Sequence, residues 1–311
     1  MPITPQMLEL ATTYRRALLA RERQAASQLV NYYGAIWGRL QGDIAALTTN
    51  IAQMQAAGET VTPAMLGRLD RMQGIQRQMA AELARFAEYA DGVISSAERE
   101  AAIAGARDAE QLVLSAFPRG AVEVQFGRMP TSAVEAMVGT LQDGSPLADL
   151  IRQAVGDAAD GFASELVSGL ALGKNPRVVA RALRSEFGMG LTRSLRIART
   201  EQLRAYRTAT LHTYQNSGGI VKGWERKATL DDRTCMACLM LDGKLYSLDE
   251  PMDDHIQGRC LPAGTLASGP LPGGLDAVLQ RRARQGQNRQ RRRAFPHPKS
   301  PCTDTQGVGC C

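Results

Sequence analysis

Three cysteines and one histidine in the C-terminal part of the chain have residue types and spacing that suit a metal ion. Cys235 and Cys238 are separated by two residues, and His255 and Cys260 follow them. Two thiols at this spacing on a turn can face one ion, and a more distant His and Cys would complete a tetrahedral Cys3His shell. Thiolate ligands suit zinc better than calcium or magnesium. The sequence therefore predicts a candidate zinc site at Cys235, Cys238, His255 and Cys260.

Two other interpretations of the Cys235–Cys238 pair stay open. The thiols could be ordinary buried packing groups, or they could form a redox pair. A thioredoxin-like redox pair follows a strand and opens a helix, whereas this sequence predicts a turn before Cys235 and an Asp-Gly loop after Cys238. A disulfide is not expected, because the N-terminal residues lack the apolar core of a signal peptide.

Aromatic residues make up only 5% of the 311 residues and alanine is abundant, a composition that favours helices over sheet. Helices are therefore expected to position the cysteines and the histidine. Apolar residues recur every three or four positions over residues 4–57 and again over about 62–117. This predicts two long antiparallel helices, packed on each other or on partner chains, of which the second is continuous or divided. After an extended stretch at 121–129, shorter helices are expected at 131–141, 146–169, 176–186 and 191–216, with Gly188 and Gly190 separating the last two.

Two short strands are expected after the helices, at 220–228 and 244–246. Asp242 and Gly243 predict a hairpin turn that leads into the second strand. The predicted fold class is mainly α, with long N-terminal helices, a helical middle, a small α+β C-terminal knuckle with a short antiparallel sheet, and a disordered tail. The predicted domains are 1–120, a long-helix assembly region, then 121–262 and the tail 263–311.

The net charge of +6 is confined to the end of the chain. Residues 1–260 contain 29 basic and 29 acidic side chains, so the basic pI does not indicate a nucleic-acid-binding fold. From Leu261 onward, proline, glycine, arginine and glutamine dominate, which predicts disorder. The tail arginines are weak nucleic-acid-binding candidates: Arg281, Arg282, Arg284, Arg289, Arg291, Arg292 and Arg293. No run of eighteen apolar residues is present, so no membrane-spanning helix and no membrane partner is expected.

Several short motifs resemble the phage Mu F-like head-morphogenesis family. They are, in chain order, Arg199 and Glu201 in an Ala-Arg-Thr-Glu run, Trp224, the turn residues Asp231, Arg233 and Thr234, the Cys235–Cys238 pair, Asp242 with Gly243, and His255 followed by Cys260. The resemblance covers roughly 145–262 within the 121–262 domain. It implies a non-enzymatic minor head protein of a tailed phage or prophage, present in several copies in the virion head and found in the host cytoplasm. The implied partners are portal and capsid proteins, with packaged DNA as a further one.

One position departs from the family's pattern. The closing motif of the family resembles His-Pro-Asn-Cys-Arg-Cys, whereas this chain has Gly258 at the position of the first cysteine. If a metal ion binds, Cys260 must therefore supply the ligand.

The motif residues also have local structural roles that do not depend on the family. Arg199 and Glu201 are expected to clamp the last long helix to the first strand through Trp224, or to form an ordinary solvated ion pair. Asp231 and Thr234 are expected to bond nearby backbone N–H groups and so tighten the turn before the cysteine pair. None of these residues forms a catalytic arrangement, so the sequence predicts that the chain is not an enzyme.

A second resemblance begins at Cys260. Residues 260–266 are similar to the opening block of an intein or Hint domain, in which a first cysteine attacks the preceding carbonyl, here that of Arg259. The later blocks of such a domain are absent from the sequence, so residues 267–311 are either a truncated or out-of-frame remnant or a native basic tail. Two alternatives to a head protein follow: an autoprocessing protein with Cys260 as nucleophile, and a non-specific nucleic-acid binder that uses the arginine-rich tail.

Overall fold

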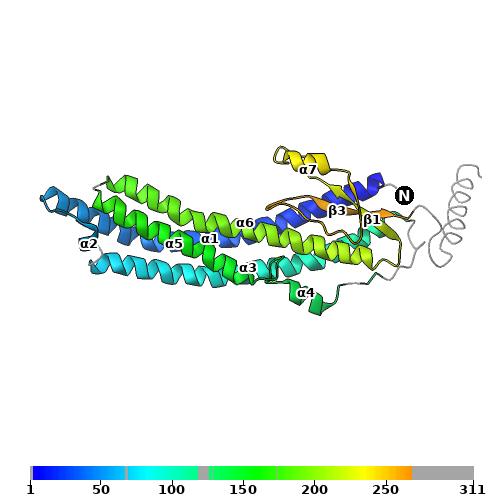
Figure 1. Ribbon diagram of the computed structural model, residues 1–311, viewed down its shortest axis with the longest axis horizontal. Coiled ribbons are helices and arrows are strands. Elements are labelled where there is room, and N and C mark those ends of the chain that lie inside the picture. Colours follow the sequence, from blue (N-terminus) through cyan, green and yellow to red (C-terminus); the bar gives the residue numbers. More distant parts are fainter. Residues whose placement is uncertain (1–2, 67–68, 118–125, 128, 173, 268–311) are drawn as a thin grey trace, which may run out of the picture.

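The computed structural model describes residues 3–66, 69–117, 126–127, 129–172 and 174–267. The seven candidate arginines of the tail and most of the expected extended stretch at 121–129 lie outside these residues. Four long helices run side by side along the molecule, and a small sheet lies at one end of them (Figure 1). No helix among the described residues is long and apolar enough to cross a lipid bilayer.

The helices largely follow the predicted pattern. They are α1 (Pro5–Ala56), α2 (Pro63–Leu66), α3 (Asp70–Leu114), α4 (Thr131–Met137), α5 (Leu147–Ala171) and α6 (Pro176–Gln215). Side-chain caps fix two of the helix starts, because Thr4 accepts a hydrogen bond from the backbone N–H of Met7 and Asn175 accepts one from Arg177. The second long helical pattern is divided, with the short α2 preceding α3.

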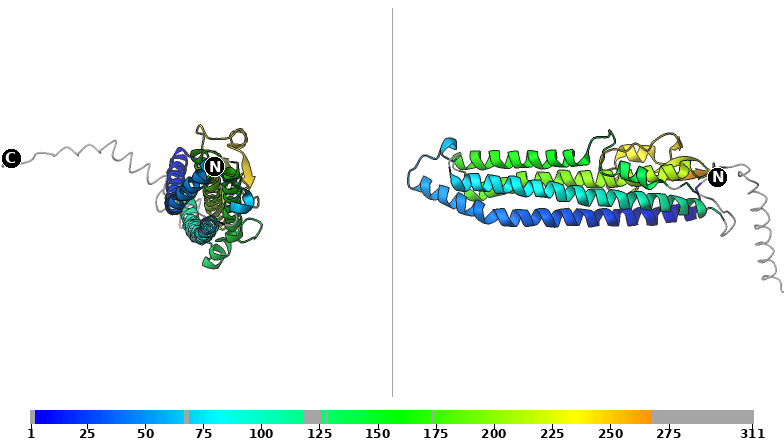
Figure 2. Two further views of the ribbon diagram at one scale, coloured as in Figure 1. Left: turned by 90° about the vertical axis from the view of Figure 1, so that its left-hand side faces the viewer. Right: turned by 90° about the horizontal axis from the view of Figure 1, so that it is seen from below.

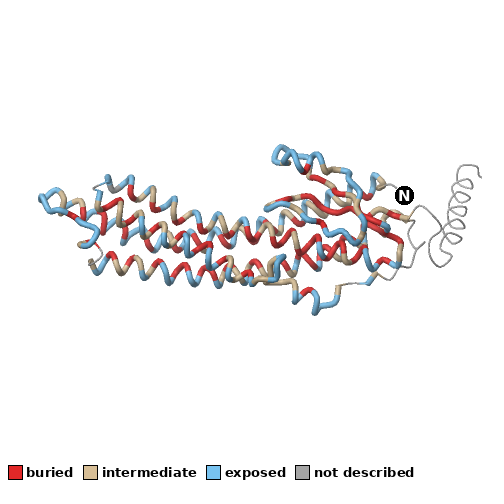
Figure 3. Tube along the Cα trace, viewed as in Figure 1, coloured by how far each residue is buried: buried red, intermediate tan, exposed pale blue. Residues whose placement is uncertain are grey.

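One hydrophobic core joins α1, α3, α5 and α6. The apolar stripe of α1 is buried inside the chain, and Tyr33 lies at its centre, with ring centroids 4.7 Å from Phe86 of α3 and 4.3 Å from Phe187 of α6. Buried residues accordingly line the inner faces of all four helices (Figure 3). Figure 2 shows the same bundle end-on and from below. The stripes therefore pack within the chain. Residues on both sides of position 120 share this core, and the domain boundary at that position stays a prediction.

The predicted break at Gly188 and Gly190 is wrong, because α6 continues through both glycines. Gly190 instead permits a close helix contact: a Cβ at this position would lie 2.7 Å from the Tyr33 hydroxyl oxygen and 3.1 Å from the Ala158 Cβ. The Tyr33 hydroxyl donates a hydrogen bond to the carbonyl of Phe187, 2.6 Å away. The glycine signal thus marks tight packing of α1 on α6 rather than a chain break.

The sheet contains three antiparallel strands in the order β2-β1-β3, namely β1 (Val221–Lys227), β2 (Leu245–Ser247) and β3 (Leu261–Leu266). The two predicted strands are confirmed as β1 and β2. Disorder from Leu261 and a tail from 263 were expected, and both expectations are wrong for β3. The reason is that β1 provides a full pairing edge, with Trp224 opposite Gly264 and Lys227 opposite Leu261. Gly264 also lies against the Tyr214 ring, where a Cβ would come within 3.1 Å.

Candidate metal centre

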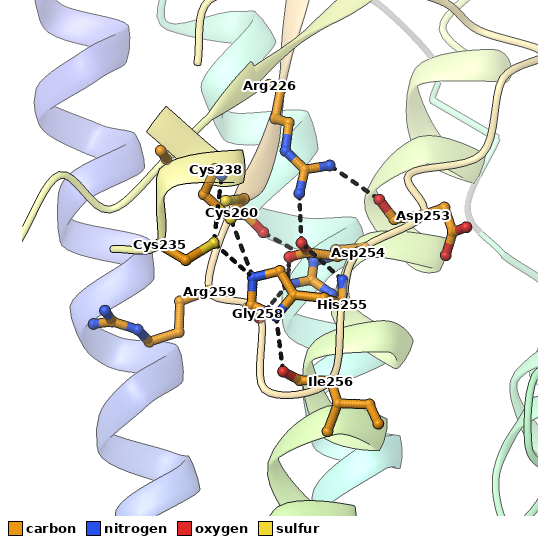
Figure 4. Close-up of polar contacts among 12 residues, drawn as sticks. Arg226, Cys235, Cys238, Asp253, Asp254, His255, Ile256, Gly258, Arg259 and Cys260 are labelled. Atoms are coloured by element: carbon orange, nitrogen blue, oxygen red, sulfur yellow. Dashed lines mark hydrogen bonds and ion pairs between the residues drawn. The ribbon is translucent and has the colours of Figure 1, made fainter. Parts of the chain in front are cut away.

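The four predicted ligands lie in the part of the chain that connects β1 to β3, residues 228–260, which we call the clasp. The clasp contains the six-residue helix α7 (Met236–Leu241), strand β2 and the loop that ends at Cys260. Cys235 caps the start of α7, and its sulfur accepts a hydrogen bond from the backbone N–H of Cys238 at 3.4 Å. The sulfurs of Cys235, Cys238 and Cys260 and the imidazole of His255 converge beside β1 (Figure 4).

The imidazole of His255 is oriented toward two sulfurs. Its Nε2 lies 3.4 Å from the sulfur of Cys235 and 3.2 Å from that of Cys238. Its Nδ1 lies 2.9 Å from the carbonyl oxygen of Ile256. Since a carbonyl oxygen only accepts, Nδ1 carries a proton, and in the neutral ring Nε2 presents its lone pair to the sulfurs. This is the tautomer and the backbone support that metal-binding histidines use.

Cys260 approaches the same group from the start of β3. The ligand atoms of Cys235, Cys238 and His255 all lie within 4.8 Å of one another, and those of Cys238, Asp254 and Cys260 form a second such group. Cys238 belongs to both groups and therefore connects them. The structure thus brings together all four residues that the sequence predicted.

The environments of the two paired thiols differ. The hydrogen bond from the Cys238 backbone N–H lowers the pKa of the exposed Cys235 thiol. Burial raises the pKa of the Cys238 thiol to about 12. The hydrogen bond from Nδ1 to the Ile256 carbonyl raises the pKa of His255. Cys238 is therefore a thiol that needs a cation beside it before it can hold a charge.

The donor set fits a zinc ion. Cys235, Cys238 and Cys260 are free thiols, and three sulfurs with one imidazole nitrogen are a ligand set that zinc prefers. The predicted loop after Cys238 is wrong, because α7 opens at the cysteine pair, as the redox interpretation required. However, a turn rather than a strand precedes the pair, and His255 lies against both sulfurs. These two features favour the metal interpretation over the redox one.

The turn before the cysteine pair is held as predicted. Thr234 Oγ1 accepts a hydrogen bond from the Asp231 N–H at 3.0 Å and donates one to Asp231 Oδ1 at 3.1 Å, while the Arg233 N–H donates to Asp231 Oδ1 at 3.2 Å. Arg259 adds a bidentate ion pair to the same carboxylate, with N···O distances of 2.5 and 2.6 Å. This pair holds the pKa of Asp231 well below its usual range. It ties the turn to the residue that precedes Cys260.

The predicted clamp through Trp224 is wrong. Arg199 donates to Glu22 of α1 and to the side chain of Gln257, and Glu201 accepts from Arg204 on its own helix. Trp224 instead stacks on Tyr246 with ring centroids 4.2 Å apart, and its Nε1 donates to the Glu250 carbonyl at 3.1 Å. Arg199 and Glu201 lie near the middle of α6, where their partners come from α1, the clasp and α6 itself. Arg199 connects the clasp to the helical bundle rather than to the sheet.

Asp242 and Gly243 form a turn, but it connects α7 to β2 and does not join two paired strands. Asp242 Oδ1 accepts a hydrogen bond from the Ala228 N–H at 2.7 Å, and the Gly243 N–H donates to the Arg226 carbonyl at 2.9 Å. Gly243 has φ of 78°, a conformation that favours glycine. The two residues thus attach the end of α7 to the end of β1.

The sequence did not single out three residues that lie behind the thiols. Arg207 and Arg226 share the buried carboxylate of Asp254. The only sequence signal for them is that Asp254 immediately precedes His255. Arg207 and Arg226 occur on different elements, so their meeting follows from the fold.

Comparison with known families supports one of the two sequence resemblances. Residues 160–263 match the family model described as phage Mu protein F like protein. This confirms the resemblance to that family for a segment that contains α6, all three ligand-bearing stretches of the clasp and the first residues of β3. No curated protein and no solved structure matches the chain.

Proposed function

We propose that this chain is a structural protein of head morphogenesis in a tailed phage or prophage. In this role it is not an enzyme, and it acts through contacts with the portal or the capsid. The observation that carries the proposal is that the family match includes the whole clasp, in which all four predicted ligands meet in space. The match supports a head protein. We propose the contacts with the portal or the capsid in addition to it.

The exposed apolar side chains favour the clasp as the contact surface. The stripes of α1 and α3 were expected to pack on each other or on partner chains, and they are buried within the bundle. Met236 and Met240 of α7 are 72% and 77% exposed, and Leu230 and Leu245 are also exposed nearby in the chain. Figure 3 shows that α7 lies on the outside of the molecule. Methionine side chains adapt to irregular partner surfaces, which suits an assembly contact.

We further propose that Cys235, Cys238, His255 and Cys260 hold one zinc ion. A bound zinc ion supplies a structural cross-link and no reaction chemistry in this role. The residues that would hold it come from the start of α7, from the loop after β2 and from the residue before β3. They would fix the clasp in one conformation, because ligand binding stabilises the folded state.

Co-expression tests the proposed partner. The full chain would be produced with the portal protein and, separately, with the major capsid protein encoded by the same phage genome. We expect one of these proteins to co-purify with the wild-type chain at a fixed ratio. If neither binds, and heads assembled without the chain are normal in number and DNA content, the proposed role is wrong.

The two alternative functions have less support. Cys260 is buried and lies in the ligand cluster, and residues 261–266 form β3, so the structure does not favour an autoprocessing centre. Incubation with and without thiol would reveal a fragment ending at Arg259 if that alternative were correct. Nucleic-acid binding by the tail depends on residues outside the described part of the chain, and deletion of 268–311 tests it.

A further inference from the structure

Two arginines and one aspartate lie directly behind the thiols of the candidate metal centre (Figure 4). The carboxylate of Asp254 has no exposed surface and accepts hydrogen bonds from Arg207 at 2.7 Å and from Arg226. The backbone N–H of His255 gives it a third hydrogen bond at 3.1 Å. Arg207 comes from α6 and Arg226 from β1, so the carboxylate joins the bundle, the sheet and the loop that carries His255.

Both arginines also hold the backbone around the ligands. Arg207 Nε donates to the Cys260 carbonyl at 2.9 Å, and its Nη2 donates to the Gly258 carbonyl. Arg226 Nη1 donates to the Asp253 carbonyl at 3.0 Å. Gly258 must lack a side chain, because a Cβ there would overlap the carboxylate of Asp254. The glycine that departs from the family's closing motif is therefore coupled to the position of Asp254.

The guanidinium of Arg226 donates to Asp254 and to the Asp253 carbonyl, and it lies near the thiols of Cys238 and Cys260. Its Nε is buried and has no hydrogen-bond partner among the described residues. Like other arginine side chains, its guanidinium stays protonated in a folded protein. Arg226 therefore keeps a positive charge beside two thiols.

The charged side chains behind the thiols carry a net positive charge. Arg207 and Arg226 carry two positive charges, and Asp254 carries one negative charge, which leaves one buried positive charge. Arg15 lies within electrostatic range of Asp242 and Arg259, and Arg259 pairs with Asp231. These two cations and two anions do not change the balance. Three thiolates, a neutral imidazole and a divalent ion together carry one negative charge. The two excess charges cancel, and an uncompensated buried charge would be costly.

Asp254 is also a rival ligand. Its carboxylate lies within 4.8 Å of the sulfurs of Cys238 and Cys260. Without the arginines, an ion beside Cys238 could therefore take a carboxylate oxygen in place of a sulfur. With them, both carboxylate oxygens are already hydrogen-bonded.

We propose that Arg207 and Arg226, bridged by Asp254, are positioning residues that select the three thiolates of Cys235, Cys238 and Cys260 for a divalent ion and keep Asp254 from acting as a ligand. This inference rests on the proposed metal centre. In this proposal the two arginines determine which side chains bind the ion and the net charge of the occupied site.

Cobalt(II) titration of the full chain tests this proposal, because thiolate-to-cobalt charge-transfer absorbance increases with the number of thiolate ligands. Cys260→Ser gives the calibration, with an expected loss of about one third of the wild-type absorbance. Arg226→Met is expected to weaken cobalt binding about tenfold or more and to lose a similar share of the absorbance. Arg226→Lys, which keeps the charge, should bind within about threefold of wild type. Arg152→Met serves as the control, because this exposed side chain pairs with Asp149 on α5, outside the clasp.

The possible results separate the inference from the metal centre itself. If the wild type binds no cobalt, the metal centre is wrong and the inference falls with it. If the wild type shows three thiolates and Arg226→Met binds within about threefold with full absorbance, only the inference is wrong. If circular dichroism shows that Arg226→Met does not fold, Arg226→Lys decides: near-wild-type binding and absorbance support the proposal, and a tenfold loss contradicts it.

Discussion

Arg199 on α6 donates two hydrogen bonds to one carboxylate oxygen of Glu22 on α1, at 2.9 Å from Nε and 2.6 Å from Nη2. The third guanidinium nitrogen donates to the side chain of Gln257 in the clasp at 3.2 Å. One side chain thereby joins the first helix, the last long helix and the loop beside His255. Because the Glu22 carboxylate is mostly buried, the ion pair is protected from solvent screening.

Substitution of Arg199 by methionine is expected to loosen the clasp without unfolding the bundle. The change leaves Glu22 without this partner and removes the contact with Gln257, at a cost of about 1–3 kcal/mol. Hydrogen exchange followed by mass spectrometry should show faster exchange of amides in 254–260 and little change in α5. Arg193, on the same helix as Arg199, forms an exposed ion pair with Asp157 of α5, and Arg193→Met is the control. Equal exchange in both variants would contradict the bridging role.

Two glycines two positions apart on α6 are expected to respond in opposite directions to alanine. Gly190→Ala places a Cβ against the Tyr33 hydroxyl and Ala158, and we expect a loss of about 1–3 kcal/mol in the free energy of unfolding. At Gly188 a Cβ meets nothing within 4 Å, so Gly188→Ala should stabilise the helix by up to about 1 kcal/mol. Urea denaturation measures both. Stabilisation by both substitutions would show that the contact with Tyr33 is not tight.

Glu98 predicts a pH dependence of stability. It lies on α3, accepts a hydrogen bond from the Gly139 N–H at 2.8 Å, and has one carboxylate oxygen 3.7 Å from Arg204. Burial raises its pKa from 4.5 to about 7, with the Gly139 hydrogen bond and Arg204 opposing the change and Glu201 and Asp91 adding to it. Between pH 4.5 and 7 the folded chain therefore binds more protons than the unfolded chain, so this group lowers stability as the pH rises.

Glu98→Gln should remove that dependence, because the amide oxygen can still accept from Gly139 but carries no charge. Relative to wild type, the variant should gain little stability near pH 4 and on the order of 2–3 kcal/mol above pH 7. Denaturation at a series of pH values tests this. The exposed Glu135, which pairs with Arg99, provides the control Glu135→Gln, for which no such gain is expected. A pH-independent difference for Glu98→Gln would contradict the assigned pKa.

The exposed methionines of α7 offer a test of the proposed contact surface. The double substitution Met236→Lys and Met240→Lys should abolish co-purification with the portal or capsid partner, because it places two charges on an apolar contact. Thermal stability should change little, since both side chains face solvent. Leu172→Lys, at an equally exposed site at the opposite end of the bundle, should leave binding intact. Loss of binding in the control alone would place the partner elsewhere.

The sequence predicted the parts of this fold that depend on local pattern. The periodic apolar stripes identify α1 and α3, and the helix predicted to begin at residue 176 does begin there. The same local evidence wrongly predicted a helix break at Gly190, because the close approach of Tyr33 comes from a helix far away in the chain. It also misread residues 261–266, whose strand conformation depends on pairing with β1 rather than on their own composition.

The sequence likewise predicted only part of the candidate site. Residue type and spacing were enough to select the four ligands, because metal binding demands particular donor atoms. The arginines behind them could not be selected, since Arg207 and Arg226 reach Asp254 only after α6, β1 and the loop have packed. The predicted contact of Arg199 and Glu201 with Trp224 was wrong for the same reason: the actual partners of Arg199 and Trp224, Glu22 and Glu250, are set by tertiary contacts.

Native mass spectrometry of the full chain purified with zinc in the medium tests the central claim most directly. We predict about one zinc ion per chain in the wild type, less than about a tenth of an equivalent in Cys238→Ser, and an unchanged wild-type value in Cys302→Ser, which alters a cysteine outside the clasp. Addition of a chelator should lower the unfolding temperature of the wild type and not that of Cys238→Ser. A wild-type chain that carries no zinc and is indifferent to chelator would contradict the account.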